Sequence, residues 1–326
     1  MFISRTPLRI SLGGGGTDLP AYYRNNGGGF LVAAAIDKYI HVAINDPFTD
    51  RYILKYSQME NVASAADIQH PLIREALLYT DTPPGIEISS VADLPAGTGL
   101  GSSGTFAVGL LKALRARSRK YAPSETIAQE ACHLEIDRLR EPVGKQDQYI
   151  AAIGGITAFE FHDDDSVSIH SVDMDRSTRE SFEDHLMLFY TGVSRSASDE
   201  LRALDEQASV ESSAIRTNLN DVRDAGREAF KVLQQGDLSA YGHMLTEQWK
   251  LKFARSPSAI HAQVDNWIAE GIAGGAAGGK LVGAGGGGFL LFLARDKQAL
   301  RATMRDLGLP EVPMGIDYRG TTVSED

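Results

Sequence analysis

Residues 95–104 carry the sequence PAGTGLGSSG, and an apolar run predicted to be a helix, residues 103–118, follows directly. A glycine-rich loop that leads into a helix presents unpaired backbone N–H groups and the positive end of the helix dipole, a combination suited to a triphosphate. The two serines add hydroxyl groups for phosphate or for a magnesium ion. The loop lacks the Lys-Ser or Lys-Thr pair of a Walker P-loop, and its glycine spacing does not fit a dinucleotide-binding fingerprint. We favour a phosphate-binding loop over a purely structural turn.

A second glycine cluster, RISLGGGGTD at residues 9–18, lies where a short predicted strand ends. Glycines let the backbone approach a ligand closely and adopt positive φ angles. Asp18, just beyond the glycines, can accept hydrogen bonds from the hydroxyl groups of a ligand. The alternative is a tight turn in which Thr17 or Asp18 caps a helix, and the cluster in isolation favours that alternative.

The third glycine cluster, KLVGAGGGGF at residues 280–289, lies between two apolar strands. Five of the six residues from 283 to 288 are glycine. A hairpin turn needs about two glycines. The surplus leaves a bare backbone surface, which favours close approach of a ligand or of another loop over a flexible hairpin.

Two acidic residues are candidates for chemistry. Glu135 shares the apolar face of a predicted helix, residues 124–139, with Cys132 and Leu139. A buried carboxylate needs a partner, and a metal ion is one such partner; the alternative is a surface glutamate at the edge of that face. Asp147 lies close to Lys145 and is either a base or a simple loop acid, and in isolation we favour the loop acid.

Sequence periodicity predicts a strand-rich N-terminal half and a helix-rich C-terminal half, with a boundary near 175–185. In the first half we expect strands at 8–12, 39–44, 52–57, 86–91 and 156–161, the two helices named above and a solvated acidic turn at 163–165. In the second half we expect a strand at 186–190, helices at 197–235, 238–254 and 257–273, a glycine-rich hairpin at 278–294, a helix at 296–307 and a terminal strand. The connections alternate too irregularly for a Rossmann sheet.

Composition excludes several classes of protein. The 326 residues carry a formal net charge of -11, which argues against a nucleic-acid-binding surface. The single cysteine, Cys132, cannot form an internal disulfide, so a reducing cytoplasmic compartment is the simpler expectation. The N-terminus lacks the pattern of a signal peptide, and no stretch approaches the ~20 apolar residues of a membrane span. We expect a soluble cytosolic protein with no nucleic-acid or membrane partner.

In order and spacing, these elements resemble the GHMP kinase superfamily, which includes galactokinase, homoserine kinase and mevalonate kinase. The motif Pro-x-x-x-Gly-Leu-Gly-Ser-Ser of that superfamily is intact at 95–103, followed here by Gly104 in place of the usual alanine, and Gly-Ala-Gly-x-Gly-Gly fits 283–288. The resemblance covers nearly the whole chain. It implies an α+β fold, with an N-terminal domain like ribosomal protein S5 domain 2 (residues 1–178) and a C-terminal ferredoxin-like domain (residues 179–326).

The resemblance also implies a role for each motif. ATP phosphates would bind Pro95, Gly97, Thr98, Gly99, Leu100, Gly101, Ser102, Ser103 and Gly104. Ser103 and Glu135 would hold Mg²⁺, Asp147 would orient and deprotonate the acceptor hydroxyl, and Arg9 would stabilise charge on the transferring phosphoryl group. The sugar would contact Gly15, Gly16, Thr17, Asp18 and Lys145. Gly283, Gly285, Gly286 and Gly287 would form a structural glycine loop.

Within the superfamily, the opening pattern RTPLRISLGGGGTDLPAYY at residues 5–23 most resembles the D-glycero-D-manno-heptose 7-phosphate kinases. These enzymes phosphorylate the anomeric C1 hydroxyl and yield the 1,7-bisphosphate used for nucleotide-activated heptose. Gly15 and Gly16 replace the Glu-His of galactokinase and leave room for a longer or phosphorylated sugar. Candidates to hold a substrate phosphate are Arg24, Arg51, Lys55, Lys145, Arg195 and Arg255, each of which is otherwise a solvated surface charge.

Two other functions remain open at this stage: a different sugar-1-kinase, of the fucose, N-acetylhexosamine or galactose type, or a non-catalytic sensor that binds sugar and ATP. Retention of Ser103, Glu135 and Asp147 argues against the sensor. A homodimer is possible on either reading. A dehydrogenase would require a dinucleotide fingerprint, which we do not find.

Overall fold

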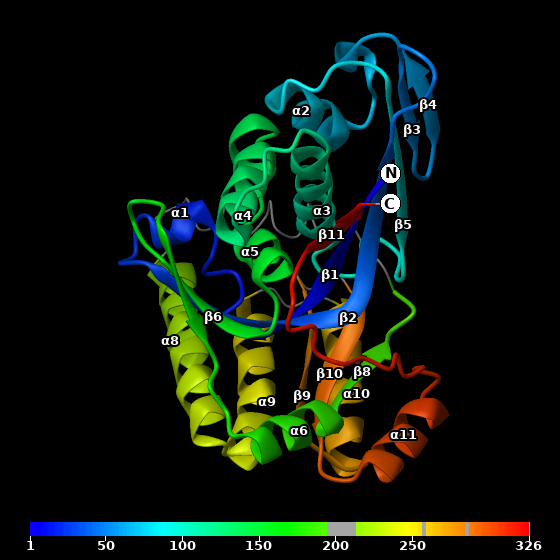
Figure 1. Ribbon diagram of the computed structural model, residues 1–326. Coiled ribbons are helices and arrows are strands. Elements are labelled where there is room, and N and C mark those ends of the chain that lie inside the picture. Colours follow the sequence, from blue (N-terminus) through cyan, green and yellow to red (C-terminus); the bar gives the residue numbers. More distant parts are fainter. Residues whose placement is uncertain (194–212, 256–258, 284–286, 326) are drawn as a thin grey trace.

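The computed structural model describes residues 1–193, 213–255, 259–283 and 287–325. Two β-sheets, one of eight strands and one of three, organise this part of the chain (Figure 1). The larger sheet consists of β1 (Phe2–Gly13), β2 (Gly29–Asn45), β3 (Tyr52–Lys55), β4 (Met59–Val62), β5 (Ile86–Ala92), β6 (Ile156–Phe161), β7 (Val167–Ser171) and β11 (Thr322–Glu325). The smaller sheet consists of β8 (Leu186–Tyr190), β9 (Ala276–Leu281) and β10 (Phe289–Ala294).

The long strand β2 is the centre of the larger sheet. One of its edges pairs antiparallel with β1, and the other is shared by β5, along residues 40–45, and β6, along residues 29–34. Residues 31–36 (LVAAAI) are completely buried, which explains why this run lacks the alternation of a half-exposed strand. β1 ends at Gly13, so the first glycine cluster continues from the end of this strand into the following loop.

Four helices cover one face of the larger sheet: α2 (Pro71–Tyr79), α3 (Ser102–Arg117), α4 (Ser124–Cys132) and α5 (Gln146–Ile153). Helix α3 packs across β1 and β2, and a Cβ at Gly109 would lie 2.7 Å from Thr6 Oγ1, so the helix lies very close to the strand. After α4 the chain continues as a π-helical segment, His133–Arg138. Such segments are rare and are frequent at functional sites.

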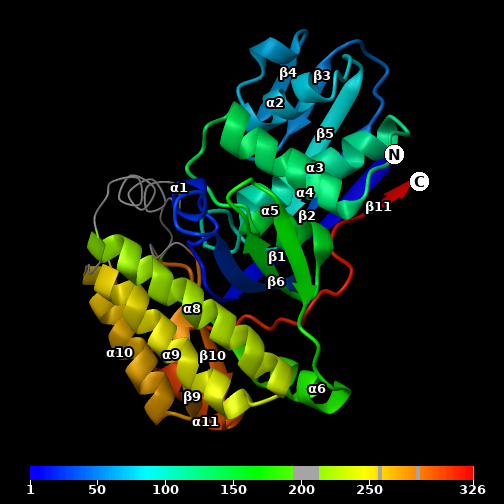
Figure 2. The same ribbon diagram turned by 90° about the vertical axis from the view of Figure 1, so that its left-hand side faces the viewer.

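The smaller sheet has the strand order β8-β10-β9 and packs against the C-terminal helices. These helices are α8 (Ser213–Gln235), α9 (Leu238–Arg255), α10 (Ala259–Ala273) and α11 (Lys297–Asp306), and α6 (Arg176–His185) leads into β8. Figure 2 shows α8, α9 and α10 side by side, and α9 and α10 both contact β9. A separate core that includes Phe189, Trp249 and Phe292 fills the space between sheet and helices. Helix α8 also packs against β1 and β2, which joins this layer to the larger sheet.

The structure confirms the α+β class and most predicted elements. The hairpin at 278–294 forms as β9 and β10, and the helices at 103–118, 238–254 and 296–307 form as α3, α9 and α11. β1 and β2 are longer than predicted, and β4, β7, α2, α5, α6 and the short α1 (Pro20–Tyr23) were not predicted. Of the helix expected at 197–235, residues 213–235 form α8 and residues 197–212 lie outside the described residues; the helix expected from 257 is described from Ala259.

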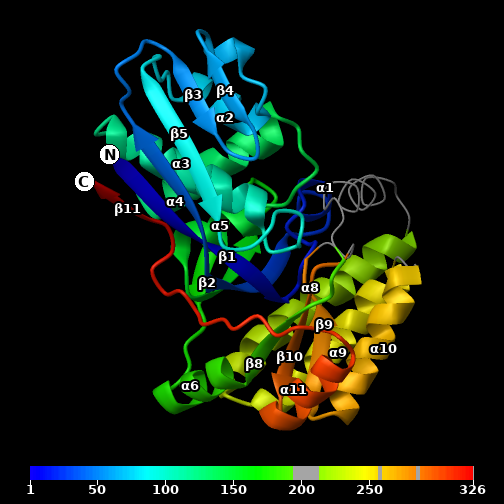
Figure 3. The same cartoon turned by 90° about the vertical axis from the view of Figure 1, so that its right-hand side faces the viewer.

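The C-terminal segment crosses back to the larger sheet, where β11 pairs antiparallel with β1 (Figure 3). Both termini therefore lie close together, beside the first strand. The division at 178 and 179 stays a prediction, and the last strand of the second segment belongs to the sheet of the first. No described helix has the length and apolar character that crossing a lipid bilayer would require.

Candidate active site

A cavity of about 750 Å³ opens between the two layers. Its walls come from the end of β1, the loop before α3, the first turn of α5, helix α9 and the end of β9. Segments from both halves of the chain therefore contribute to a single cavity, and the three glycine clusters of the sequence meet in it.

The loop at 95–104 has the geometry of an anion site. Gly101 has a φ of 78° and immediately precedes α3, so the first N–H groups of the helix are free of intrahelical partners. The loop is fixed to β1 through Arg9, whose backbone N–H donates to the Leu100 carbonyl at 3.1 Å and whose Nη1 donates to the Gly99 carbonyl at 2.6 Å. These two hydrogen bonds therefore attach the loop to the strand.

Arg9 and Asp147 form an ion pair at the base of the cavity. Arg9 Nε donates to Asp147 Oδ1 at 2.6 Å, and 26% of the Asp147 side chain is exposed while that of Arg9 is buried. Asp147 lies in the first turn of α5, where the helix dipole favours a negative charge. A Cβ at Gly104 would lie 2.8 Å from Asp147 Cβ, so the glycine allows α3 to approach α5.

Asp18 is held beside this pair by backbone and side-chain donors. Its Oδ1 accepts from Gly16 N at 3.1 Å and from Gln146 Nε2 at 3.2 Å, and its Oδ2 accepts from Gln146 N at 3.1 Å. Burial, together with the nearby charge of Asp147, raises the pKa of Asp18. A Cβ at Gly144 would lie 1.9 Å from Asp18 Oδ2, so a larger residue at position 144 would displace the Asp18 carboxylate from these donors.

Glu135 lies behind the phosphate loop, on the π-helical segment. Its Oε1 accepts a hydrogen bond from Ser103 Oγ, and its Oε2 accepts from Gln148 Nε2 at 2.6 Å. Burial raises the pKa of Glu135 to about 7, and no cationic side chain of the described residues forms an ion pair with it. A carboxylate and a hydroxyl are hard oxygen ligands, so this pair fits a Mg²⁺ ion whose charge would offset the cost of burial.

The third glycine cluster packs backbone to backbone against the phosphate loop. A Cβ at Gly283 would lie 2.6 Å from Gly99 Cα, and a Cβ at Gly288 would lie 2.0 Å from the Thr98 carbonyl oxygen. Close approach of another loop is therefore the reason for these two glycines. Gly287 approaches the Val193 carbonyl in the same way, and Gly285 and Gly286 lie outside the described residues.

The structure brings most of the predicted site residues to the cavity. Its lining includes Arg9, Gly15, Gly16, Asp18, Gly97, Gly99, Gly101, Ser102, Ser103, Asp147 and Gly283. The other predicted residues that the structure describes are not among the lining: Thr17, Pro95, Thr98, Leu100, Gly104, Glu135, Lys145 and Gly287. Thr17 supports the first glycine loop from below, because its Oγ1 donates to the carbonyl oxygens of Gly14 and Phe30.

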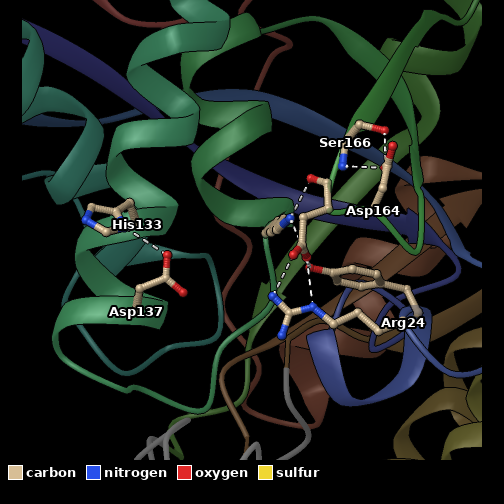
Figure 4. A network of polar contacts seen from close by, with 8 residues as sticks. Arg24, His133, Asp137, Asp164 and Ser166 are labelled. Atoms are coloured by element: carbon tan, nitrogen blue, oxygen red, sulfur yellow. Dashed lines mark hydrogen bonds and ion pairs between the residues drawn. The ribbon is translucent and has the colours of Figure 1, made fainter.

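Lys145 and Arg24 both form hydrogen bonds with Asp165. Figure 4 shows Arg24 within this network of polar contacts. Asp165 accepts two hydrogen bonds from Arg24 at 2.8 and 2.9 Å and one from Tyr23 at 2.6 Å, and its backbone carbonyl accepts from Lys145 Nζ at 2.8 Å. These contacts lower the pKa of Asp165 to about 2 despite its partial burial. In the predicted acidic turn, the cations Arg24 and Lys145 therefore contact only the last residue, Asp165. Among the described contacts, Asp164 accepts hydrogen bonds only from the neighbouring Ser166.

Two other predicted phosphate-binding cations, Arg51 and Lys55, are not among the residues that line the cavity. Arg51 bonds the side chain and carbonyl of Asn61, and Lys55 forms an ion pair with Glu87. Arg195 and the side chain of Arg255 lie outside the described residues. The basic side chains that do line the cavity, besides Arg9, are Lys252 and Lys280.

Sequence reasoning missed both of these lysines. Lys280 is the residue at which the third glycine cluster begins, but the sequence pattern of its strand does not indicate which face of that strand is buried. Gln146 and Gln248, which line the cavity through α5 and α9, carried no sequence signal.

Comparison with known proteins identifies the chain. The family model for the GHMP kinases N terminal domain matches residues 60–155, and the model for the GHMP kinases C terminal domain matches residues 229–308. Together the matches take in more than half of the chain. The chain belongs to the GHMP kinase family.

The D-glycero-alpha-D-manno-heptose 7-phosphate kinase of Campylobacter jejuni is 27% identical to this GHMP kinase over 310 residues, which are 89% of this chain and 88% of that protein. The L-fucokinase/L-fucose-1-P guanylyltransferase of Bacteroides fragilis is 26% identical over 90% of this chain, which spans only 35% of that longer protein. The crystal structure of a D-glycero-D-manno-heptose 1-phosphate kinase from Bacteroides thetaiotaomicron shares the fold, with a TM-score of 0.81 at 23% identity over 100% of this chain and 99% of that one.

This GHMP kinase is a sugar kinase, a phosphotransferase that acts on an alcohol group. The kinases of this family depend on ATP, and their sugar substrates are small molecules that a cavity of this size can enclose.

Proposed function

We propose that this sugar kinase transfers the γ-phosphoryl group of ATP to the anomeric C1 hydroxyl of D-glycero-D-manno-heptose 7-phosphate, giving the 1,7-bisphosphate for nucleotide-heptose synthesis. The observation that carries the proposal is the Arg9–Asp147 pair, which opens on the same cavity as Asp18 and the N-terminus of α3. A group that accepts a proton, a cation and an anion site thus lie together, as phosphoryl transfer to an alcohol requires.

We place the triphosphate on the loop from Gly97 to Ser103, where the N-terminus of α3 favours negative charge. The adenine then lies toward the end of the cavity lined by Tyr56, His70 and Phe106. The rings of Tyr56 and His70 are 4.8 Å apart, and burial lowers the pKa of His70, so this wall is aromatic and uncharged at neutral pH. An apolar wall of this kind suits a flat base.

Ser103 and Glu135 would hold Mg²⁺ through their side-chain oxygens, with the remaining ligands supplied by phosphates and water. Bound there, the ion would neutralise charge on the phosphates. Gln148 supports this role, because its hydrogen bond to Oε2 leaves the other oxygen of Glu135 facing Ser103.

Asp147 would orient the acceptor hydroxyl and take its proton as the oxygen attacks the γ-phosphorus. Arg9 holds the Asp147 carboxylate in place through their ion pair, and its guanidinium would offset negative charge on the phosphoryl group during transfer. The proton moves to an oxygen of Asp147, and ADP leaves with the electrons of the broken P–O bond.

Asp18 would bind hydroxyl groups of the sugar, and Gly15 and Gly16 leave space where a larger side chain would restrict its far end. Thr17 would act by shaping this loop, and Lys145 by fixing Asp165 beneath α5. The similarity to the L-fucokinase favours a neutral 6-deoxy sugar as the second candidate acceptor.

The proposal is tested by measuring ADP release with Mg-ATP and a panel of acceptors. The panel is D-glycero-D-manno-heptose 7-phosphate, unphosphorylated heptose, mannose 6-phosphate, galactose and fucose. We expect the highest kcat/KM with heptose 7-phosphate, and phosphorus NMR of the product should show a new phosphate on C1. A higher kcat/KM with fucose or another neutral sugar would replace the proposed acceptor and keep the sugar kinase.

A further inference from the structure

A lysine–glutamine pair lines the acceptor side of the cavity and has no part in the mechanism above. Lys280, at the end of β9, is only 7% exposed, and its Nζ donates to Gln248 Oε1, on α9, at 2.8 Å. Among the described residues no carboxylate lies within ion-pair distance of Lys280. A buried ammonium group with only an amide oxygen as partner is costly, so a packing role does not explain it.

The hydrogen bond to Lys280 fixes the direction of the Gln248 amide. An ammonium group can only donate, so the amide oxygen must face Lys280 and Nε2 must face the other way. Gln248 is 9% exposed and lines the cavity, and its Nε2 has no hydrogen-bond partner in the structure as described. The pair therefore presents donors alone to the cavity, and a buried donor without an acceptor costs stability.

The surroundings of the pair are cationic. Burial, Lys252 and Arg9 together lower the pKa of Lys280 to about 7. Lys252 Nζ donates to the carbonyls of Leu281, at 3.3 Å, and Gly283, at 2.5 Å, and it too lines the cavity. An anionic group placed among these side chains would relieve their mutual repulsion and restore the charge on Lys280.

We propose that Lys280 and Gln248 form the subsite for the phosphate group that the acceptor sugar already carries. The inference rests on the proposed function and names the residues that select a phosphorylated sugar. It places that phosphate on the β9–α9 side of the cavity. The triphosphate of ATP is placed separately, at the N-terminus of α3.

The position of Gln248 favours binding of the acceptor's phosphate over binding of the ATP triphosphate. A Cβ at Gly13 would lie 3.3 Å from Gln248 Nε2, so the free amide group is next to the first glycine loop. That loop carries Gly15, Gly16 and Asp18, the residues assigned to the sugar. The free amide group of Gln248 therefore lies beside the loop to which we assign the sugar, which favours the phosphate of the acceptor.

A second cavity, of about 380 Å³, offers a competing place for the phosphate because Arg24 and Arg140 line it. Arg24 is already held by Asp165 through two hydrogen bonds. The lining of this cavity includes none of Arg9, Asp18 and Asp147, so a phosphate there would not share a cavity with the reacting groups.

The test compares kcat/KM for heptose 7-phosphate with kcat/KM for unphosphorylated heptose in the wild-type enzyme and in three variants. Lys280→Met and Gln248→Leu remove the donors, and Gln248→Glu supplies an internal carboxylate that would occupy Lys280. We expect the preference for the phosphorylated sugar to fall by about 10- to 100-fold in each variant, the range set by charge-assisted hydrogen bonds. The KM for ATP and the kcat/KM for unphosphorylated heptose should change little.

Lys112→Met is the matched control, because Lys112 is a half-buried lysine on α3 outside the cavity, and Arg140→Ala tests the second cavity. A wild-type enzyme without preference for heptose 7-phosphate would overturn the proposed acceptor and this subsite together. A wild-type preference that survives in Lys280→Met and Gln248→Leu would overturn the subsite alone, as would a preference lost in Arg140→Ala instead. A rise in the KM for ATP in Lys280→Met would assign the pair to the triphosphate. Thermal melting of each variant establishes that it is folded.

Discussion

Two carboxylates of the site have opposite surroundings, and their chemistry follows from the difference. Asp147 is partly exposed and paired with Arg9, which suits a group that must meet a substrate hydroxyl. Glu135 is buried against Ser103 and Gln148 without a cationic partner among the described residues, which suits a carboxylate that binds a metal ion. Environment separates the roles of two side chains with the same functional group.

Replacement of the proposed base should remove turnover without removing nucleotide binding. In Asp147→Asn the acceptor hydroxyl loses the group that takes its proton, so we expect kcat to fall by about 10²- to 10⁴-fold. The KM for ATP should stay close to that of the wild type, because the loop at 97–103 is unchanged. Steady-state ADP release measures both quantities. Asp164→Asn, on an exposed turn, is the control, and wild-type turnover in Asp147→Asn would remove Asp147 from the mechanism.

Glu135 predicts a specific dependence of stability on pH. Burial raises its pKa from the ordinary 4.5 to about 7, so the folded protein holds this proton more tightly than the unfolded chain does. This group's contribution to the free energy of unfolding should therefore fall as the pH rises from 4.5 to about 7 and stay low above that. We expect Mg²⁺ to raise the melting temperature of the wild type at pH 8, because it binds the folded state only.

Glu135→Gln tests both parts of that prediction. The variant should melt higher than the wild type at pH 8 without Mg²⁺, should gain nothing from added Mg²⁺, and should lose kinase activity. Glu125→Gln is the matched control, because Glu125 is exposed on α4, the helix that precedes the π-helical segment of Glu135. A Mg²⁺-dependent rise in melting temperature that persists in Glu135→Gln would place the ion elsewhere.

At the scale of elements, the site depends on contact between two glycine loops. The phosphate loop before α3 and the loop after β9 touch through Gly99 and Gly283, both of which have positive φ angles. The two loops follow strands of different sheets, so their contact couples the two layers at the proposed site of the nucleotide phosphates.

An added methyl group at this contact should weaken nucleotide binding. In Gly283→Ala the new Cβ would lie 2.6 Å from Gly99 Cα, and backbone cannot move aside as a flexible side chain would. Overpacking of this kind costs about 1–3 kcal/mol, so kcat/KM for ATP should fall by about tenfold or more. Gly308→Ala is a matched control because Gly308 also has a positive φ, of 74°, with no atom within 4 Å of its Cβ position. Equal effects of both substitutions would mean that backbone conformation alone, and not the loop contact, carries the cost.

At the scale of the whole molecule, the last strand ties the second layer to the first. β11 adds to the edge of β1, the strand that carries Arg9, and Thr321 Oγ1 lies 2.8 Å from Thr6 Oγ1 in the interior. Asp317 accepts from Tyr39 and pairs with Arg5 on the same sheet. The C-terminal segment thus covers the edge of β1 along residues 2–5, and the short strand β11 becomes the edge strand of the sheet.

Deletion of residues 321–326 should lower stability more than activity. The truncated protein loses the β1–β11 ladder, so we expect a lower melting temperature and aggregation on heating, with kcat at low temperature nearly unchanged. Differential scanning calorimetry and light scattering measure the two effects. Ser324→Ala keeps the strand and serves as the control, and an unchanged melting temperature after the deletion would show that β11 contributes no stability.

Only the family resemblance made Asp147 a catalytic candidate, because in isolation it resembles a simple loop acid. The sequence alone was enough for the fold class and for the choice of the glycine loop before α3, Glu135 and Asp18 as candidates. Each belongs to a local pattern: a glycine loop before a helix, an acid on an apolar helical face, an acid after a strand. It was not enough for α5, because a short helix of eight residues after a glycine and lysine resembles a loop. The proposed phosphate cations were also chosen without knowledge of their partners, and Arg24, Arg51 and Lys55 are occupied elsewhere.

By itself, then, the sequence determined what can be read over a few neighbouring residues: glycine-rich loops, strands, helices and the acids attached to them. Only the tertiary structure decided which distant residues meet. It paired Arg9 with Asp147 and packed Gly283 against Gly99. It also placed Lys280 and Gln248 in the lining of the same cavity as Asp18. The physical reason is that burial, charge pairing and backbone contact depend on how separate elements pack, and no local pattern of residue types encodes that packing.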